Sequence, residues 1–127
     1  MTELFRGMKE NAQGLPQIGE SSRSLGVRPR IDVQAIDPGD LVQPGQGGMS
    51  VSPDDPQSLP YFRRPLALGG TGKDPVWRIT DAQLGPDLRY RPDPASPGHG
   101  FVEASRSMTL SEYQRALAQT QRLWQRN

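Results

Sequence analysis

Three short groups of polar residues are the parts of this sequence that could carry chemistry. Glu103 ends a β-favouring run that follows a loop rich in glycine and proline, and catalytic carboxylates often lie beside such loops. Arg6 stands in an apolar run near the start, while Ser50 and Ser52 follow a glycine-rich segment. Electrostatic catalysis at Glu103 and anion or ligand binding at the other residues would require the three groups to meet in one site.

The arginine and the two serines each have two interpretations. On a strand Arg6 shares a face with Leu4, so it is either an edge residue whose charged end reaches water or a guanidinium fixed in a cleft. The neighbouring Gly7 would let a ligand approach the backbone closely. Ser50 and Ser52 also share a face, and their hydroxyls either meet solvent or bind a ligand and position a carboxylate.

The remaining candidates are Glu103 and the nearby His99. Glu103 is expected on the face of Phe101, as either a solvated strand end or a carboxylate with a functional task. His99 is the single histidine, and it serves either as a loop hydrogen-bonding residue or as a ligand contact. The chain has no cysteine and His99 has no evident partner, so a nucleophilic triad and a multi-histidine metal site are not expected.

Two glycine-rich segments imitate nucleotide-binding motifs without their context. Residues 69–73 end in Gly-Lys, but Ala67 and Asp74 occupy the positions of the first glycine and the magnesium-binding hydroxyl of a phosphate loop. Residues 45–50 lack the third glycine of the dinucleotide fingerprint. We expect the first segment to be a flexible connection and the glycines of the second to turn the backbone into the next strand.

Composition limits the class of protein. The 127 residues suit one domain, 1–127, and with 33% apolar residues, 14 Gly and 13 Pro we expect a small core and many loops. The net charge of +1 is no footprint of a nucleic-acid-binding protein, so nucleic acid is an unlikely partner. No membrane-length apolar run and no hydrophobic signal region are present, so we expect a cytoplasmic location, with delivery by a specialised export machine left open.

The predicted elements are strands and one helix. The helix is expected over about 110–125, because Thr109 and Glu112 form a capping box and Leu110, Leu117 and Trp124 recur at helical spacing. Strands are expected at 2–8, weakly at 31–36, and at 49–52, 76–79, 88–90 and 101–103. Long loops cover 53–75 and 92–98.

The order of these features resembles a known family. An arginine in the first strand, a glycine-rich lead into Ser-x-Ser and a late strand glutamate resemble ADP-ribosyltransferase toxins of the arginine–serine–glutamate class. The resemblance is closer to small bacterial toxins exported by type VI secretion that have an ADP-ribosyltransferase-like fold. It spans about residues 4–124.

This resemblance implies a fold, a cofactor and roles for particular residues. The fold would be α+β, a split, mixed sheet around an NAD cleft. Arg6 would hold the NAD phosphates, and Gly7, Ser50, Ser52 and His99 would also contact the cofactor. Ser50 would in addition help to place the glutamate. Glu103 would stabilise the oxocarbenium-like ribose as nicotinamide leaves. A cognate antitoxin or immunity protein would be the partner.

Two positions differ from the family pattern and leave the reaction open. Val51 stands where the class has threonine, and Phe101 stands where it has glutamate or glutamine. ADP-ribose transfer to an acceptor other than arginine, NAD cleavage and an inactive NAD-binding relative all fit. The alternatives from other classes are a non-enzymatic protein-binding module, such as an immunity or inhibitory protein, and an RNA-targeting toxin.

Overall fold

The computed structural model describes residues 1–127, with eight strands, one α-helix and four short 3₁₀ helices. The strands are β1 Glu3–Gly7, β2 Leu41–Val42, β3 Met49–Pro53, β4 Val76–Thr80, β5 Leu88–Pro92, β6 Gly100–Ala104, β7 Met108–Thr109 and β8 Gln125–Arg126. The α-helix α1 is Leu110–Ala118, and the 3₁₀ helices are Pro56–Ser58, Leu66–Leu68, Asp81–Gln83 and Gln121–Leu123.

Six strands form one sheet in the order β5-β6-β3-β1-β4-β8, and β2 pairs with β7 separately. All these strand pairs are antiparallel, and parallel contacts occur only as isolated bridges between loop residues. The α+β class is therefore confirmed, whereas the expectation of a mixed sheet is wrong. Parallel neighbours need long crossover connections, usually helical, and the single α-helix follows β7 near the end of the chain.

Helix α1 begins where the sequence predicts but ends earlier. Thr109 accepts a hydrogen bond from the Glu112 amide at 3.1 Å, and the Glu112 carboxylate accepts one from the Thr109 amide, which confirms the capping box. The expected extension to residue 125 is wrong. Thr120 donates to the Leu117 carbonyl at 2.7 Å and accepts from the Trp124 indole at 2.9 Å, so Trp124 reaches the core from a 3₁₀ turn.

The expected strand at 31–36 is also wrong. The Asp32 carboxylate accepts hydrogen bonds from the amide and the guanidinium of Arg28, and the Asp32 amide donates to the Arg28 carbonyl at 2.9 Å. These local hydrogen bonds use backbone groups that a strand would need for pairing, so they favour a turn. Val33 and Ala35 are nevertheless buried, so the loop contributes to the core.

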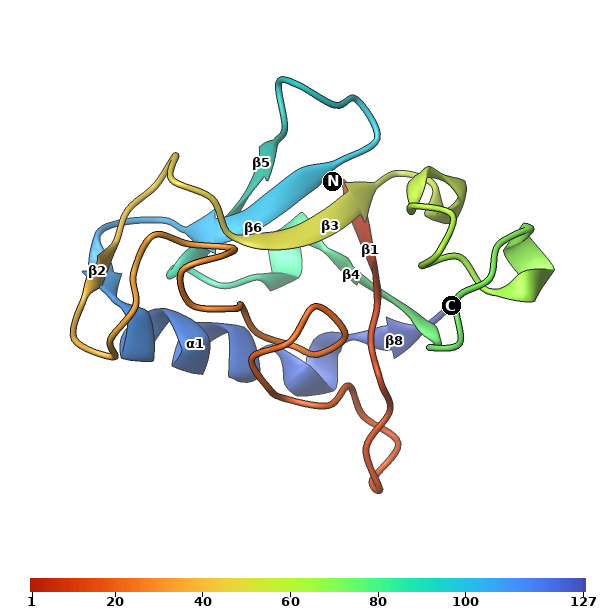
Figure 1. The fold of residues 1–127 in the computed structure, drawn as a ribbon, viewed down its shortest axis with the longest axis horizontal. Coiled ribbons are helices and arrows are strands. Elements are labelled where there is room, and N and C mark those ends of the chain that lie inside the picture. Colours follow the sequence, from red (N-terminus) through yellow and green to blue (C-terminus); the bar gives the residue numbers. More distant parts are fainter.

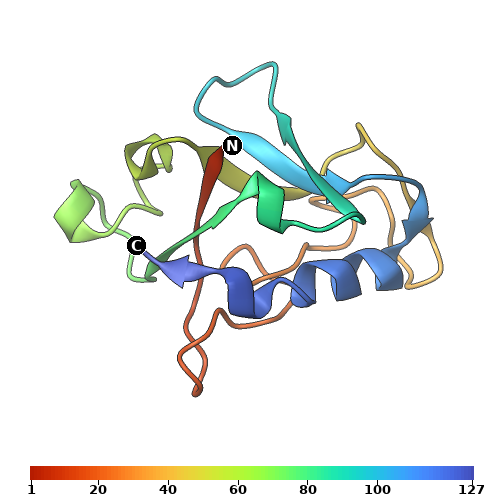
Figure 2. The same cartoon turned by 180° about the vertical axis from the view of Figure 1, so that it is seen from behind.

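Helix α1 lies along one face of the sheet, and the loop between β1 and β2 fills the space beside it (Figure 1). Figure 2 shows from the opposite side that β8 continues from the helix to the edge of the sheet beside β4. The main core joins strand residues to helix residues, including Leu4, Met49, Val102 and Leu117. The other face of β1 carries a smaller cluster of Phe5, Leu59 and Val76.

Strand β3 joins the two halves of the sheet, and its register is the feature that forms the site. Its first residues, Met49 to Val51, pair with β6, whereas Ser52 and Pro53 pair with Phe5 and Leu4 of β1. The β1–β3 ladder is therefore only two residue pairs long. Beyond Phe5 the two strands separate, and the side chain of Arg6 bridges them.

Candidate functional site

The guanidinium of Arg6 is fixed between β1 and β3. Its Nη1 donates to the Ser50 carbonyl at 2.8 Å, while Nε and Nη2 donate to the Ser24 carbonyl at 3.2 and 2.9 Å. Arg6 pairs with Trp77 in register and lies on the core face, where it is buried. Of the two interpretations of the sequence, the structure therefore shows a fixed guanidinium, and three of its five N–H groups are used by carbonyls.

No carboxylate forms an ion pair with Arg6. Burial lowers the pKa of Arg6 to about 10, and the nearby charge of Asp32 offsets only part of that effect. Buried charges in proteins are normally paired, because desolvation disfavours an isolated ion. A buried cation without an ion-pair partner, with two N–H groups free, favours an anionic ligand beside it.

A pocket of about 190 Å³ opens at this separation of the strands. Five of the six predicted site residues line it, and these are Arg6, Gly7, Ser50, Ser52 and His99. The remainder of the lining comes from Val51 of β3 and from loop residues within 22–32 and 59–63. The structure thus brings the strand arginine, the Ser-x-Ser segment and the histidine of the last loop into one cavity.

A second cation in this pocket lacks a carboxylate partner. Arg63 donates to the Ser22 hydroxyl at 2.7 Å and forms no ion pair, whereas Arg28 is neutralised by Asp32 at 2.9 Å. Desolvation, together with Arg23 and Arg28, lowers the pKa of Arg63 in spite of Asp74. Two guanidinium groups and several hydroxyls in one cavity are a donor set that suits phosphate oxygens.

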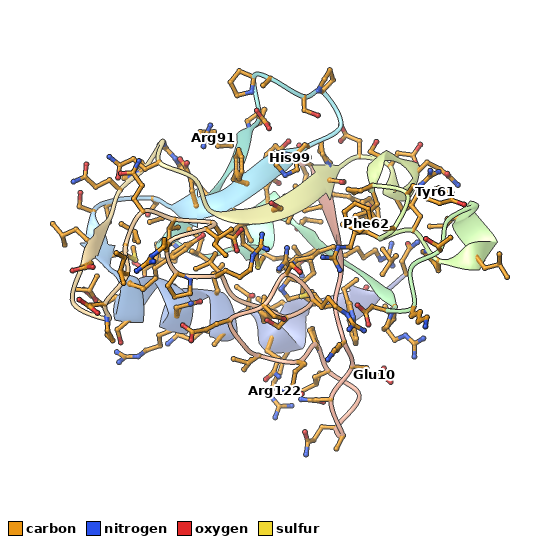
Figure 3. The ribbon with its side chains drawn as sticks, in the orientation of Figure 1. Glu10, Tyr61, Phe62, Arg91, His99 and Arg122 are labelled. Carbon is orange, nitrogen blue, oxygen red and sulfur yellow. The ribbon has the colours of Figure 1, made fainter.

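His99 enters the pocket from the loop between β5 and β6. Its Nδ1 lies 2.8 Å from the Asp93 carboxylate, and its ring meets the Phe101 ring edge-on, with centroids 4.8 Å apart. The guanidinium of Arg91 lies on Phe101 as well, 4.7 Å from the ring centre. Figure 3 labels Arg91 and His99 near β5 and β6, and Phe62 on the loop that follows β3.

Glu103 does not line the pocket. It follows Phe101 on the same face of β6, and Phe101 is the register partner of Ser50. The carboxylate is fully buried between Arg89 and Arg91, each 2.6 Å away, and also accepts the Gly45 amide at 3.0 Å. Burial disfavours its charge, but the Arg91, Gly45 and Arg89 hydrogen bonds outweigh that effect and lower the pKa of Glu103.

The glycine-rich lead into β3 positions the loop that covers Glu103. Gly47 has φ +101°, and a Cβ there would lie 2.4 Å from the Asp32 carbonyl. A Cβ at Gly48 would lie 2.7 Å from the Val102 carbonyl. Both positions therefore require glycine, as expected from the sequence. The absence of side chains lets the loop backbone pack directly against Asp32 on one side and against β6 on the other.

Five residues of this neighbourhood were not predicted from the sequence. Arg63 and Ser22 lie in loops whose course no local pattern reveals, Arg89 lies in the predicted strand 88–90, and Arg91 follows that strand. Alternation along residues 88–92 was the available signal, because two arginines on one face of a strand can meet a carboxylate on the next strand. Asp93 carried no signal beyond its place in a proline-rich loop.

Comparisons with family models, curated proteins and solved structures find no match to this chain. Within the structure, no helix has the length and apolar character needed to cross a membrane. The pocket between β1 and β3 and its chemistry are therefore the basis for assigning a function.

Proposed function

We propose that this pocket binds NAD and that the protein cleaves the nicotinamide–ribose bond, either to transfer ADP-ribose or to hydrolyse NAD. The observation that carries the proposal is the buried, carboxylate-free guanidinium of Arg6, held at the separation of β1 and β3. In this proposal the protein is a bacterial toxin with a split ADP-ribosyltransferase-like sheet, controlled by a cognate antitoxin or immunity protein.

The pyrophosphate group of NAD matches the cations of the pocket. The unused N–H groups of Arg6 and the guanidinium of Arg63 supply charge-assisted donors, and the hydroxyl-bearing residues Ser50 and Ser52 line the same pocket. His99, which lines the cavity and packs on Phe101, supplies an aromatic surface for the ligand. These contacts support binding of a dinucleotide rather than of an uncharged ligand.

Glu103 has the charge that the cleavage step needs. A carboxylate stabilises the positive charge that develops on the ribose as the glycosidic bond breaks. Both oxygens of Glu103 are held by arginines, and one of them also by Gly45, so this role requires Arg91 and the Gly45 amide to release Oε1. Arg91 is the partner whose guanidinium lies over Phe101, next to the pocket residue His99.

The proposal is tested by incubating the purified protein with NAD. Released nicotinamide is measured by chromatography, and ADP-ribose transfer by labelled NAD with cell extract as the acceptor source. We expect release by the wild-type protein and at least a 100-fold slower release by Glu103→Gln, assayed at a temperature where both proteins are folded. Absence of NAD binding, nicotinamide release and transfer would refute the proposal.

A second candidate function, a protein-binding module, is favoured by the loop between β3 and β4. Tyr61, Phe62 and Leu66 are 59%, 62% and 86% exposed, which is unusual for three large apolar side chains so close in sequence. Arginines at positions 63 and 64 lie over the Phe62 and Tyr61 rings. Co-expression with the product of the neighbouring gene tests it: a complex lost in Phe62→Ser supports binding at this loop.

A further inference from the structure

His99 lines the pocket, and its ring forms a dyad with the Asp93 carboxylate. The Asp93 carboxylate lies 2.8 Å from Nδ1 and also accepts the Ala95 amide at 2.9 Å, while the Asp93 amide donates to the His99 carbonyl at 3.0 Å. A carboxylate facing Nδ1 assigns the proton to that nitrogen and leaves a lone pair on Nε2. No protein group occupies Nε2, and it is not sealed from solvent.

The ring itself is held in place. Phe101 packs edge-on against it at an interplanar angle of 81°, and the hairpin loop that carries His99 is closed by backbone hydrogen bonds to Asp93 and Ser96. The imidazole is 29% exposed and the Asp93 carboxylate 19%, so the pair is partly shielded from water. This is the arrangement of an oriented base rather than of a free surface histidine.

The other groups of the pocket cannot easily take up a proton. Its arginines are donors only, and its serines are hydroxyls. The lining contains one carboxylate, Asp32, which is neutralised by Arg28 at 2.9 Å. Glu103 lies outside the lining and is engaged by two arginines. His99 is therefore the group in this cavity with an unoccupied lone pair for general-base work.

We propose that His99 acts as a general base toward a hydroxyl acceptor, water or an alcohol group, in ADP-ribose transfer in this pocket, with Asp93 as its positioning residue. This inference rests on the proposed function. The acceptor oxygen bonds to C1′ of the ribose as the C1′–nicotinamide bond breaks, and the electron pair of that bond neutralises the pyridinium nitrogen. Nε2 takes the acceptor proton and later returns it to solvent.

This assignment also selects the acceptor class. A protein arginine is a poor acceptor for an imidazole base, because the guanidinium keeps its proton at all physiological pH values. A hydroxyl needs only to lose its proton as the bond to C1′ forms, which a neutral imidazole supports.

The test compares wild type, His99→Asn, His99→Gly and Asp93→Asn with NAD, monitoring nicotinamide release and, with labelled NAD, ADP-ribose on water or on hydroxyl-bearing acceptors. Asn at position 99 can keep a donor toward Asp93 but has no Nε2. We expect kcat, measured at saturating NAD, to fall about 100-fold or more in both His99 variants. We expect imidazole to restore activity to His99→Gly.

Asp93→Asn is expected to lower kcat with KM unchanged and to alter the ¹⁵N shifts that report the His99 tautomer. Cleavage that continues unchanged in His99→Asn overturns the role of His99 and leaves the proposed function standing. Absence of cleavage by the wild-type protein overturns both. Label recovered on arginine instead of on water or a hydroxyl overturns the acceptor class.

Discussion

Arg6 and Ser50 are joined by a 2.8 Å hydrogen bond from the Arg6 guanidinium to the Ser50 carbonyl, across the point where β1 and β3 separate. This bond replaces the ladder pairing that the two strands lose beyond Phe5. One side chain therefore holds the two halves of the sheet together and also faces the pocket between them. Fold stability and the proposed ligand binding are therefore linked at this arginine.

Replacing Arg6 by Lys should lower the free energy of unfolding by about 3 kcal/mol, because an ammonium group cannot donate to the Ser24 and Ser50 carbonyls at once and leaves a buried acceptor unpaired. Urea unfolding monitored by circular dichroism measures the change. Arg78→Lys on neighbouring β4 is the matched control, because Arg78 is exposed. Equal stability of the two variants would contradict the bridging role of Arg6.

A variant of Arg63 tests the proposed binding separately from fold stability, because Arg63 lines the pocket but lies outside the sheet. Arg63→Gln should weaken the binding of ADP-ribose at least tenfold, as one charge-assisted contact to phosphate is lost, with the melting temperature nearly unchanged. Isothermal titration calorimetry measures the affinity. The control is Arg64→Gln, since its arginine does not line the pocket. Equal affinities in the two variants would argue against a phosphate contact at Arg63.

Glu103 should make stability depend on acidity. Its pKa is lowered in the folded state, so its contribution is fully present above the pKa of the unfolded chain, about 4.3, and is lost as pH falls through the lower folded value. Glu103→Gln should cost about 2 kcal/mol at pH 7, and the difference from wild type should shrink between pH 5 and about pH 3. Unfolding curves of both proteins measured across this pH range test this. A difference in free energy of unfolding that stayed constant with pH would show that the ion pairs of Glu103 do not stabilise the fold.

The N-cap of α1 gives a local test of the fold. Thr109→Ala removes the acceptor of the Glu112 amide and should lower the free energy of unfolding by about 1 kcal/mol. Ser111→Ala, one position into the helix and exposed, should change it by a few tenths at most. Thermal unfolding of both variants measures this. A Thr109 variant as stable as the Ser111 variant would show that the cap contributes little.

Local patterns in the sequence predicted the five longer strands, the start of α1 and five of the 13 residues that line the pocket. Alternation in the first strand placed Arg6 on the face of Leu4, and the capping box placed the start of α1 correctly. Trp124 fitted the helical spacing but reaches the core from a 3₁₀ turn, since Thr120 hydrogen bonding ends the helix, an effect that spacing does not reveal.

The partners of the charged groups could not be predicted. Asp93 meets His99, and Arg89 meets Glu103, through the pairing of β5 with β6 and the loop between them, and this register is set by the packing of the whole sheet. Gly45 reaches Glu103 because the glycine-rich loop folds back over β6, a contact between residues 58 positions apart. Such long-range contacts depend on tertiary structure and leave no local periodicity.

An NMR titration of the ¹⁵N-labelled protein with NAD tests most directly whether the cavity between β1 and β3 binds the pyrophosphate of NAD. We expect saturable shifts of the Arg6 Nε–H, of the Ser50 and Ser52 amides and of His99, with affinity reduced at least tenfold in Arg63→Gln. The absence of saturable shifts, or shifts confined to residues outside this cavity, would contradict it.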